Sequence, residues 1–240
     1  MPLIEIKHPD GRSRTFAHRG SRADIGVIRQ IFVNEEYSLR RLRRCHEITE
    51  RDRSIIAAGS TPLIVDAGAN IGASVVYWGL NYPQSKIVAI EPNADNVNLL
   101  RANSENLNVQ IHHAAIGSRN GCAHLIDPGE GEWGYRTEPN ETGETPVISM
   151  ENIMAANSDL EYINFIAKID IEGGEKDLFS EETKWVDSFD VLIIELHDWM
   201  LPRRGTSRNF LHCISQLDRD FVHIGENIFS IRNWTPPGTL

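Results

Sequence analysis

Cysteine is scarce in this 240-residue chain, which contains only Cys45, Cys122 and Cys213. These residues are too far apart for a CxxC metal or redox motif and too few for a disulfide framework, so we expect reduced thiols. The sequence also lacks long apolar runs, and its first residues have neither the basic nor the apolar segment of a signal peptide. We therefore expect a cytoplasmic protein without a membrane span.

The chain also has fewer basic than acidic residues. Lys and Arg number 24 against 34 Asp and Glu, which gives a formal net charge of −10. A field of this sign repels a phosphate backbone. The visible basic cluster, Arg40, Arg41, Arg43 and Arg44, has a helical rhythm and is interpreted as a solvated helix face. We expect no nucleic-acid partner.

What is present is an alternation of strand and helix patterns that begins near residue 61. Residues 1–60 are predicted to form an N-terminal helical extension, with a short strand over 3–6 and helices over 23–33 and 39–58. Residues 61–235 are predicted to form one domain, because repeated βαβ units are typical of a parallel sheet in an α/β protein.

Within the predicted domain, near-continuous apolar runs mark the strands, as a sheet buried on both faces requires. The last two strands flank a Gly-Glu-Asn turn and predict a terminal β-hairpin. The expected strands are 63–66, 86–91, 109–113, 122–126, 165–170, 191–196, 220–224 and 228–232, and the expected helices are 71–82, 95–104, 150–157, 175–179 and 210–217.

One connection is unusually long and polar. Residues 127–146 are rich in Gly, Pro, Glu and Thr, and connections of this length in a compact domain are commonly functional. We expect this segment to be a lid whose Trp133 and Tyr135 stack on a ring of an acceptor. Residues 198–204 are expected to add a second wall, where Arg203 and Arg204 are candidates for recognising an anion.

The strongest local motif is Asp-Ala-Gly-Ala-Asn-Ile-Gly at residues 66–72, between a predicted strand and a predicted helix. A ligand at the carboxyl edge of a parallel sheet lies against bare backbone, so Gly68 and Gly72 either leave room for it or tighten the turn. Asn70 can add a side-chain hydrogen bond. A glycine-rich turn alone is weak evidence for a ligand site.

A second acidic position strengthens the motif. Glu91 ends the next predicted strand at about the spacing where a carboxylate accepts from ribose hydroxyls, which indicates an adenosine-containing ligand. The turn lacks the G-x-G-x-x-G run and the P-loop that seat phosphates, and Asp66 would repel a diphosphate but suit an ammonium. We therefore expect S-adenosyl-L-methionine as the cofactor.

These residues, together with Ser-Met-Glu at 149–151 and above all Lys-Ile-Asp-Ile-Glu-Gly-Gly-Glu at 168–175, resemble the FkbM-type S-adenosylmethionine-dependent methyltransferases. The resemblance runs from about residue 63 to 232. It implies the Rossmann-like class I methyltransferase fold, an α/β fold with a mostly parallel seven-stranded sheet, and O-methylation of a hydroxyl on a sugar or natural product. The cofactor contacts that it implies are Asp66, Gly68, Asn70, Gly72 and Glu91.

The sequence departs from the family pattern in two places. Ala67 replaces a commoner hydrophobic residue, and 149–151 replaces a commoner Thr-Leu-Asp. Many methyltransferases also hold adenine with an acid after the third strand, and this chain has none there. Adenine recognition is therefore expected to use backbone groups and Ala115 or Ile116.

Two residues are candidates for the methyl-transfer step because each follows a central strand and should face the cofactor crevice. His197 is the first choice for general base, since a neutral imidazole is available near pH 7 without a pKa shift. The alternative is that it only orients its loop. Asp170 is expected to bind the methionine ammonium, to polarise the acceptor or to ligate a metal with Glu172, and the alternative is a helix N-cap. We predict no metal site, although magnesium could use Asp170.

Two other functions stay open at this point. A nucleotide-sugar or NAD-dependent oxidoreductase would use a related sheet, but the third glycine of its motif is missing. A non-catalytic S-adenosylmethionine-binding module would keep the pocket and lack turnover. The expected partner is a small-molecule or glycan acceptor, and the N-terminal helices leave a homo-oligomer contact open.

Overall fold

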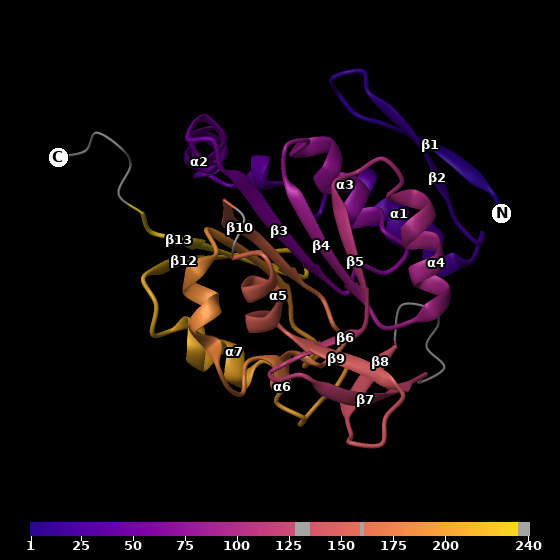
Figure 1. Ribbon diagram of the computed structural model, residues 1–240, viewed down its shortest axis with the longest axis vertical. Coiled ribbons are helices and arrows are strands. Elements are labelled where there is room, and N and C mark those ends of the chain that lie inside the picture. The colour runs from indigo at the N-terminus through magenta and orange to yellow at the C-terminus, as the bar shows by residue number, and fades with distance from the viewer. Residues whose placement is uncertain (128–134, 159–160, 235–240) are drawn as a thin grey trace.

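The computed structural model describes residues 1–127, 135–158 and 161–234. Its centre is a seven-stranded sheet in the order β12-β13-β11-β10-β3-β4-β5 (Figure 1). Five neighbouring strands are parallel, and β13 runs antiparallel to both β11 and β12. The strands are β3 (Thr61–Ala67), β4 (Lys86–Glu91), β5 (Val109–His113), β10 (Tyr162–Ile169), β11 (Val191–Glu195), β12 (Arg219–Ile224) and β13 (Asn227–Arg232). The predicted α/β fold with a terminal hairpin is confirmed.

Helices cover both faces of this sheet because alternate side chains of each strand point to opposite faces. In β3, Ile64 packs into one core and its neighbours Leu63 and Val65 into the other. The first core contains residues of α1 to α4, and the second contains residues of α5 to α7. The helices are α1 (Arg22–Phe32), α2 (Cys45–Ala57), α3 (Ala73–Asn81), α4 (Ala94–Asn103), α5 (Met150–Ala156), α6 (Glu175–Leu178) and α7 (Arg208–Ile214).

Side-chain caps explain where several helices begin. Ser21 caps α1, Asn93 caps α4 and Ser149 caps α5, each by accepting a hydrogen bond from a backbone N–H three residues later. A cap of this kind is worth about 1 kcal/mol. The cap on α5 gives a structural role to the first residue of the Ser-Met-Glu motif.

The first 60 residues pack on the sheet and share its first core. They contain a hairpin of β1 (Leu3–Lys7) and β2 (Ser13–Ala17), of which β2 was not expected. The predicted helix over 39–58 is interrupted: a 3-10 turn, η1 (Leu39–Arg41), precedes α2, because buried Leu42 is extended. A second 3-10 turn, η2 (Thr183–Ser188), precedes β11.

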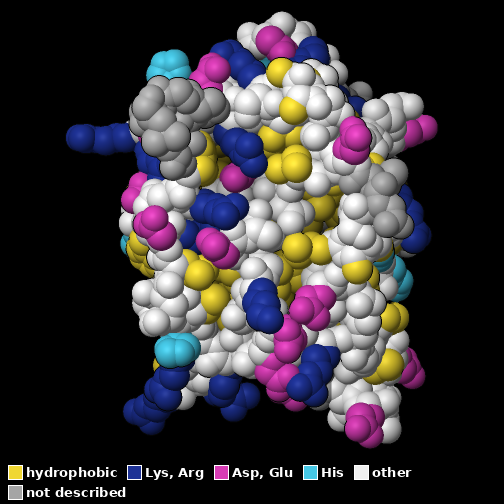
Figure 2. All heavy atoms as spheres, turned by 60° about the vertical axis from the view of Figure 1, so that its left-hand side comes forward, with side chains coloured by type: hydrophobic (Ala, Val, Ile, Leu, Met, Phe, Trp, Pro, Cys, Tyr) yellow, Lys and Arg dark blue, Asp and Glu magenta, His cyan; other side chains and the backbone are white. Residues whose placement is uncertain are grey.

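The basic cluster is only partly a solvated face. Arg40, Arg41 and Arg43 are exposed, but Arg44 is half-buried and donates to Asp220 and Glu47. On the face shown in Figure 2, basic and acidic side chains are interspersed. None of the helices in the described ranges is long and apolar enough to span a membrane.

A smaller four-stranded sheet lies at the bottom of Figure 1, in the order β6-β9-β7-β8. Its strands are β6 (Ala115–Gly117), β7 (Gly121–Ile126), β8 (Arg136–Pro139) and β9 (Thr145–Ser149). The expected polar lid over 127–146 therefore contains a whole strand and the start of another, because both pair with β7. Trp133 lies outside the described residues.

Candidate active site

The turn between β3 and α3 is shaped by three residues with left-handed backbone: Gly68 (φ 80°), Asn70 (φ 49°) and Gly72 (φ 88°). A Cβ on Gly68 would lie 1.7 Å from the backbone oxygen of Asp170, and a Cβ on Gly72 would lie 2.8 Å from the side chain of Leu100. Both glycines therefore allow neighbouring backbone and side chains to approach the turn. Close packing, rather than only room for a ligand, explains why these positions carry glycine.

Glu91 ties this turn to the next one. Its carboxylate is buried, with 4% of the residue exposed, and accepts from the backbone N–H of Asn70 at 2.9 Å and of Asn93 at 3.0 Å. The side-chain amide of Asn96 donates to it at 3.1 Å. Burial raises the pKa of Glu91, against the lowering effect of these hydrogen bonds. Glu91 thus holds two strand-end turns together.

A cavity of about 550 Å³, counting space open to solvent, lies over these turns. Four of the six predicted cofactor residues line this cavity, namely Gly68, Asn70, Glu91 and Ala115. The other two, Asp66 and Gly72, are absent from its lining among the described residues. No sequence pattern indicated two polar residues of the lining, Thr137 of strand β8 and Asn96 of helix α4. The other lining residues are Ile90, Pro92, Asn96, Ala114, Ile116, Tyr135, Thr137, Asp170, Ile171 and Glu172.

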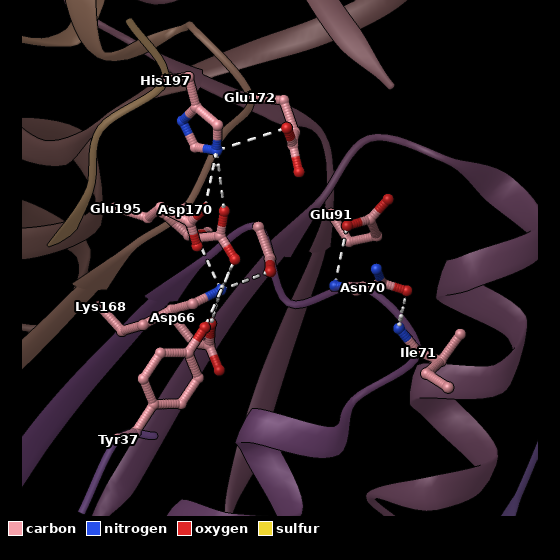
Figure 3. A network of polar contacts seen from close by, with 12 residues as sticks. Tyr37, Asp66, Asn70, Ile71, Glu91, Lys168, Asp170, Glu172, Glu195 and His197 are labelled. Atoms are coloured by element: carbon pink, nitrogen blue, oxygen red, sulfur yellow. Dashed lines mark hydrogen bonds and ion pairs between the residues drawn. The ribbon is translucent and has the colours of Figure 1, made fainter. Parts of the chain in front are cut away.

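Asp66 is completely buried and forms an ion pair with buried Lys168 (Figure 3). The Nζ of Lys168 lies 3.3 Å from Asp66 and 3.5 Å from Asp170, and donates to the carbonyl of Gly68 at 2.7 Å. Burial lowers the pKa of Lys168, but the two carboxylates outweigh burial and raise it. The cation beside Asp66 is therefore this lysine.

His197 is enclosed by carboxylates. Its side chain is 1% exposed, its Nδ1 lies 2.9 Å from Glu175, and its Nε2 lies 3.4 Å from Glu172 and 3.6 Å from both Asp170 and Glu195. Burial lowers the pKa of His197, but the hydrogen bond to Glu175 and the surrounding negative charges raise it to about 10. The expectation of a neutral imidazole without a pKa shift is therefore wrong.

Burial also raises the pKa of Glu172 and of Glu195 to about 8, with the charge of Asp170 acting in the same direction and His197 opposing it. Asp170 does not cap a helix, since the residue before α6 is Gly174. Its carboxylate instead accepts from the hydroxyl of buried Tyr37 at 3.4 Å. No sequence pattern indicated Tyr37, which lies 133 residues earlier.

A second, larger cavity of about 1330 Å³ on the same measure meets the first at Asn70, Asp170 and Glu172. The N-terminal extension supplies one wall, and Trp199 and Met200 supply another, as expected for that segment. Arg203 and Arg204 are not among the described residues that line it. The remaining lining residues are Gly26, Val27, Arg29, Gln30, Asn34, Glu36, Glu195 and Glu226.

The order of the strands, with cavities at their carboxyl ends, defines a class I methyltransferase fold. Comparison with protein families agrees, because the methyltransferase FkbM domain model matches residues 66–226. The chain therefore belongs to the FkbM methyltransferase domain family. This assignment confirms the resemblance and favours methyl transfer over an oxidoreductase.

Similar proteins carry methyltransferase names. "Methyltransferase 1" of Beauveria bassiana (strain ARSEF 2860) is 28% identical over 162 residues, which are 56% of this chain and 64% of that protein. Methyltransferase sdnD of Sordaria araneosa is 61% identical over only 33 residues, 14% of this chain and 13% of that protein. The chain thus spans less than two thirds of the length of these relatives.

Among solved structures, an O-methyltransferase from Bacillus cereus in complex with SAH is 11% identical. The match covers 90% of this chain and 93% of that chain, with a TM-score of 0.43.

Proposed function

We propose that this protein is an S-adenosylmethionine-dependent O-methyltransferase that acts on a hydroxyl of a small molecule, sugar or natural product. The observation that carries the proposal is the meeting of two cavities at Asp170 and Glu172. A methyl transfer needs a donor site and an acceptor site that share one wall, because the reacting atoms must approach each other in line.

The residues that line the first cavity suit the cofactor in polarity and charge. Ala114, Ala115 and Ile116 offer an apolar wall for adenine, and Glu91 offers carboxylate oxygens for ribose hydroxyls. Asp170 and Glu172 lie on the same lining and suit the positively charged methionine end. When bound, S-adenosylmethionine supplies an electrophilic methyl group on its sulfonium sulfur.

We assign removal of the acceptor proton to Asp170 and His197. Asp170 lines both cavities, so its carboxylate is the first proton acceptor in reach of a hydroxyl at their junction. His197 lies beside Asp170 and Glu172 and serves to hold both carboxylates in place. The N-terminal extension, residues 1–60, contributes to acceptor binding by the domain over 61–235.

Calorimetry with S-adenosylhomocysteine tests the cofactor assignment. The protein should bind this ligand and not NAD, and Glu91→Gln should weaken binding about 10-fold to 100-fold, as expected for a lost hydrogen bond to a charged group. Glu50→Gln changes an exposed carboxylate on α2 and serves as the control. Heat with NAD and none with S-adenosylhomocysteine would reject the proposal.

Because Glu91 also accepts from three protein donors, a melting curve of each variant must accompany the titration. Catalysis needs its own measurement: a mass gain of one methyl group on a candidate acceptor in the presence of S-adenosylmethionine. Binding without turnover on any hydroxyl compound would instead identify a non-catalytic binding module.

A further inference from the structure

Three side chains at the junction of the two cavities converge on one point. Asp170 and Glu172 follow β10, and His197 follows β11. Each offers one oxygen or nitrogen atom, and these atoms all lie within 4.8 Å of one another. Metal–ligand bonds of about 2.1 Å place neighbouring ligand atoms of an octahedral site about 3.0 Å apart and opposite ones about 4.2 Å apart. The observed spacing fits such a site with small side-chain movements.

The state of His197 is an independent observation. The side chain is almost completely buried, yet its Nε2 makes no hydrogen bond to any residue that the structure describes. The carboxylate oxygens in front of Nε2 lie at 3.4 to 3.6 Å, which is beyond normal hydrogen-bond length. A ring nitrogen of a buried histidine therefore faces three carboxylates at ion-pair distances that leave room for an ion between them (Figure 3).

The other ring nitrogen is held as in metal sites. Nδ1 lies 2.9 Å from Glu175, whose side chain is completely buried and also accepts from the backbone N–H of Gly173 at 3.2 Å. A carboxylate behind a histidine fixes the ring orientation and makes the opposite nitrogen a better ligand. Glu175 has this position behind the His197 ring, and it is not among the described residues that line either cavity.

We propose that Asp170, Glu172 and His197 bind one divalent cation at the junction of the two cavities, with Glu195 beside it. One imidazole with two carboxylates is a mixed nitrogen and oxygen set, which suits Mn²⁺ better than the all-oxygen preference of Mg²⁺ or the thiolate-rich sites of structural zinc. This replaces the expectation of no metal, which rested on the lack of a compact motif in the sequence.

The ion would face both cavities, since Asp170 and Glu172 line each of them. Coordination positions not filled by the protein are open to water or to an acceptor oxygen, so the ion would orient the hydroxyl and make it more acidic. That role rests on the proposed function. Binding of the ion does not, because it follows from the protein ligands alone.

The test is a titration of the full chain with MnCl₂ after treatment with EDTA and buffer exchange, followed by calorimetry and by the electron paramagnetic resonance signal of free Mn²⁺. We expect one ion per chain. Glu172→Gln should weaken binding by 10-fold to 100-fold, as loss of a ligand or its support does. Glu172 is partly exposed whereas His197 is buried. Glu172→Gln should therefore fold even if His197→Ala does not.

Glu226→Gln is the matched control, because Glu226 lines the second cavity but is not one of the three proposed ligands. Its Mn²⁺ affinity should stay within threefold of the original. Equal weakening by both variants would show a diffuse acidic field instead of a site and would overturn the proposal. Tighter binding of Mg²⁺ than of Mn²⁺ would overturn the assigned ion class.

A parallel titration with S-adenosylhomocysteine separates the two proposals. Binding of S-adenosylhomocysteine without binding of Mn²⁺ would refute the cation site and leave the methyltransferase proposal intact. Binding of Mn²⁺ by a protein that does not bind S-adenosylhomocysteine would refute the methyltransferase proposal and leave the cation site intact.

Discussion

Gly68→Ala should destabilise the protein strongly, because this residue has both a left-handed backbone and a neighbour in the way. The added Cβ would meet the backbone oxygen of Asp170 at 1.7 Å, so one of the two chain segments must move. A left-handed alanine costs about 1–2 kcal/mol, and forcing atoms into a packed interior costs about 1–3 kcal/mol more. We expect the free energy of unfolding to fall by about 2–5 kcal/mol.

Gly225→Ala separates these two contributions. Gly225 also has a positive φ, 64°, but no described atom lies within 4 Å of the position that a Cβ on this residue would occupy. It should therefore show the backbone cost of about 1–2 kcal/mol without the clash. The entropy that alanine removes from the unfolded chain is similar in both variants and cancels in their difference.

Urea denaturation followed by fluorescence and circular dichroism measures both variants against the original protein. The difference between them should be about 1–3 kcal/mol, the size of the steric cost. Variants that agree within about 0.5 kcal/mol would refute the argument, because substitutions at unconstrained surface positions have effects of that size. Such a result would mean that Gly68 and Asp170 are not in close backbone contact.

Two further changes test the buried charges around the site. Lys168→Met should lower the free energy of unfolding by about 3–5 kcal/mol in urea, because it leaves buried Asp66 without its cation, whereas exposed Lys176→Met should change it by less than about 0.5 kcal/mol. A loss below about 1 kcal/mol for Lys168→Met would contradict the buried ion pair. Burial raises the pKa of Glu91 above its ordinary value of 4.5, so above that pH ionisation of Glu91 favours the unfolded state. Glu91→Gln cannot ionise, so its free energy of unfolding relative to that of the original protein should rise as the pH increases from 4.5 toward 7. A difference that stays flat across this range, as expected for Glu50→Gln, would contradict it.

Local sequence patterns were sufficient to predict the strands of the central sheet. The run Val-Leu-Ile-Ile-Glu of β11 is apolar on both faces, and the glycine turn after β3 carries its own conformational signal, so both could be predicted. Strand β2, Ser-Arg-Thr-Phe-Ala, was missed because three of its five residues are polar, and β8 was missed because it is a short polar edge strand. Pairing with neighbours, rather than composition, makes these segments strands.

The site was predictable only where a residue's position along its strand decided its place. Glu91 ends β4 and Asp170 follows β10, and the common edge of parallel strands brings them together. The partner of Asp66 was not predictable, because it depends on the register of β10 against β3, in which Lys168 lies opposite Asp66. The contact of Tyr37 with Asp170 depends in turn on how the N-terminal extension packs on the sheet.

The charges at the junction explain why the same residues suit a cationic cofactor and a metal ion. Five acids lie together here against two basic residues, so the formal charge with every group ionised is five minus two, or three negative charges. The acids are Asp66, Asp170, Glu172, Glu175 and Glu195, and the bases are Lys168 and His197. Two like charges about 4 Å apart repel by about 4 kcal/mol at an effective dielectric constant of about 20. A sulfonium or a divalent cation placed between the carboxylates would remove part of this repulsion, so binding of either would offset part of the energy that burial of these acids costs the free protein.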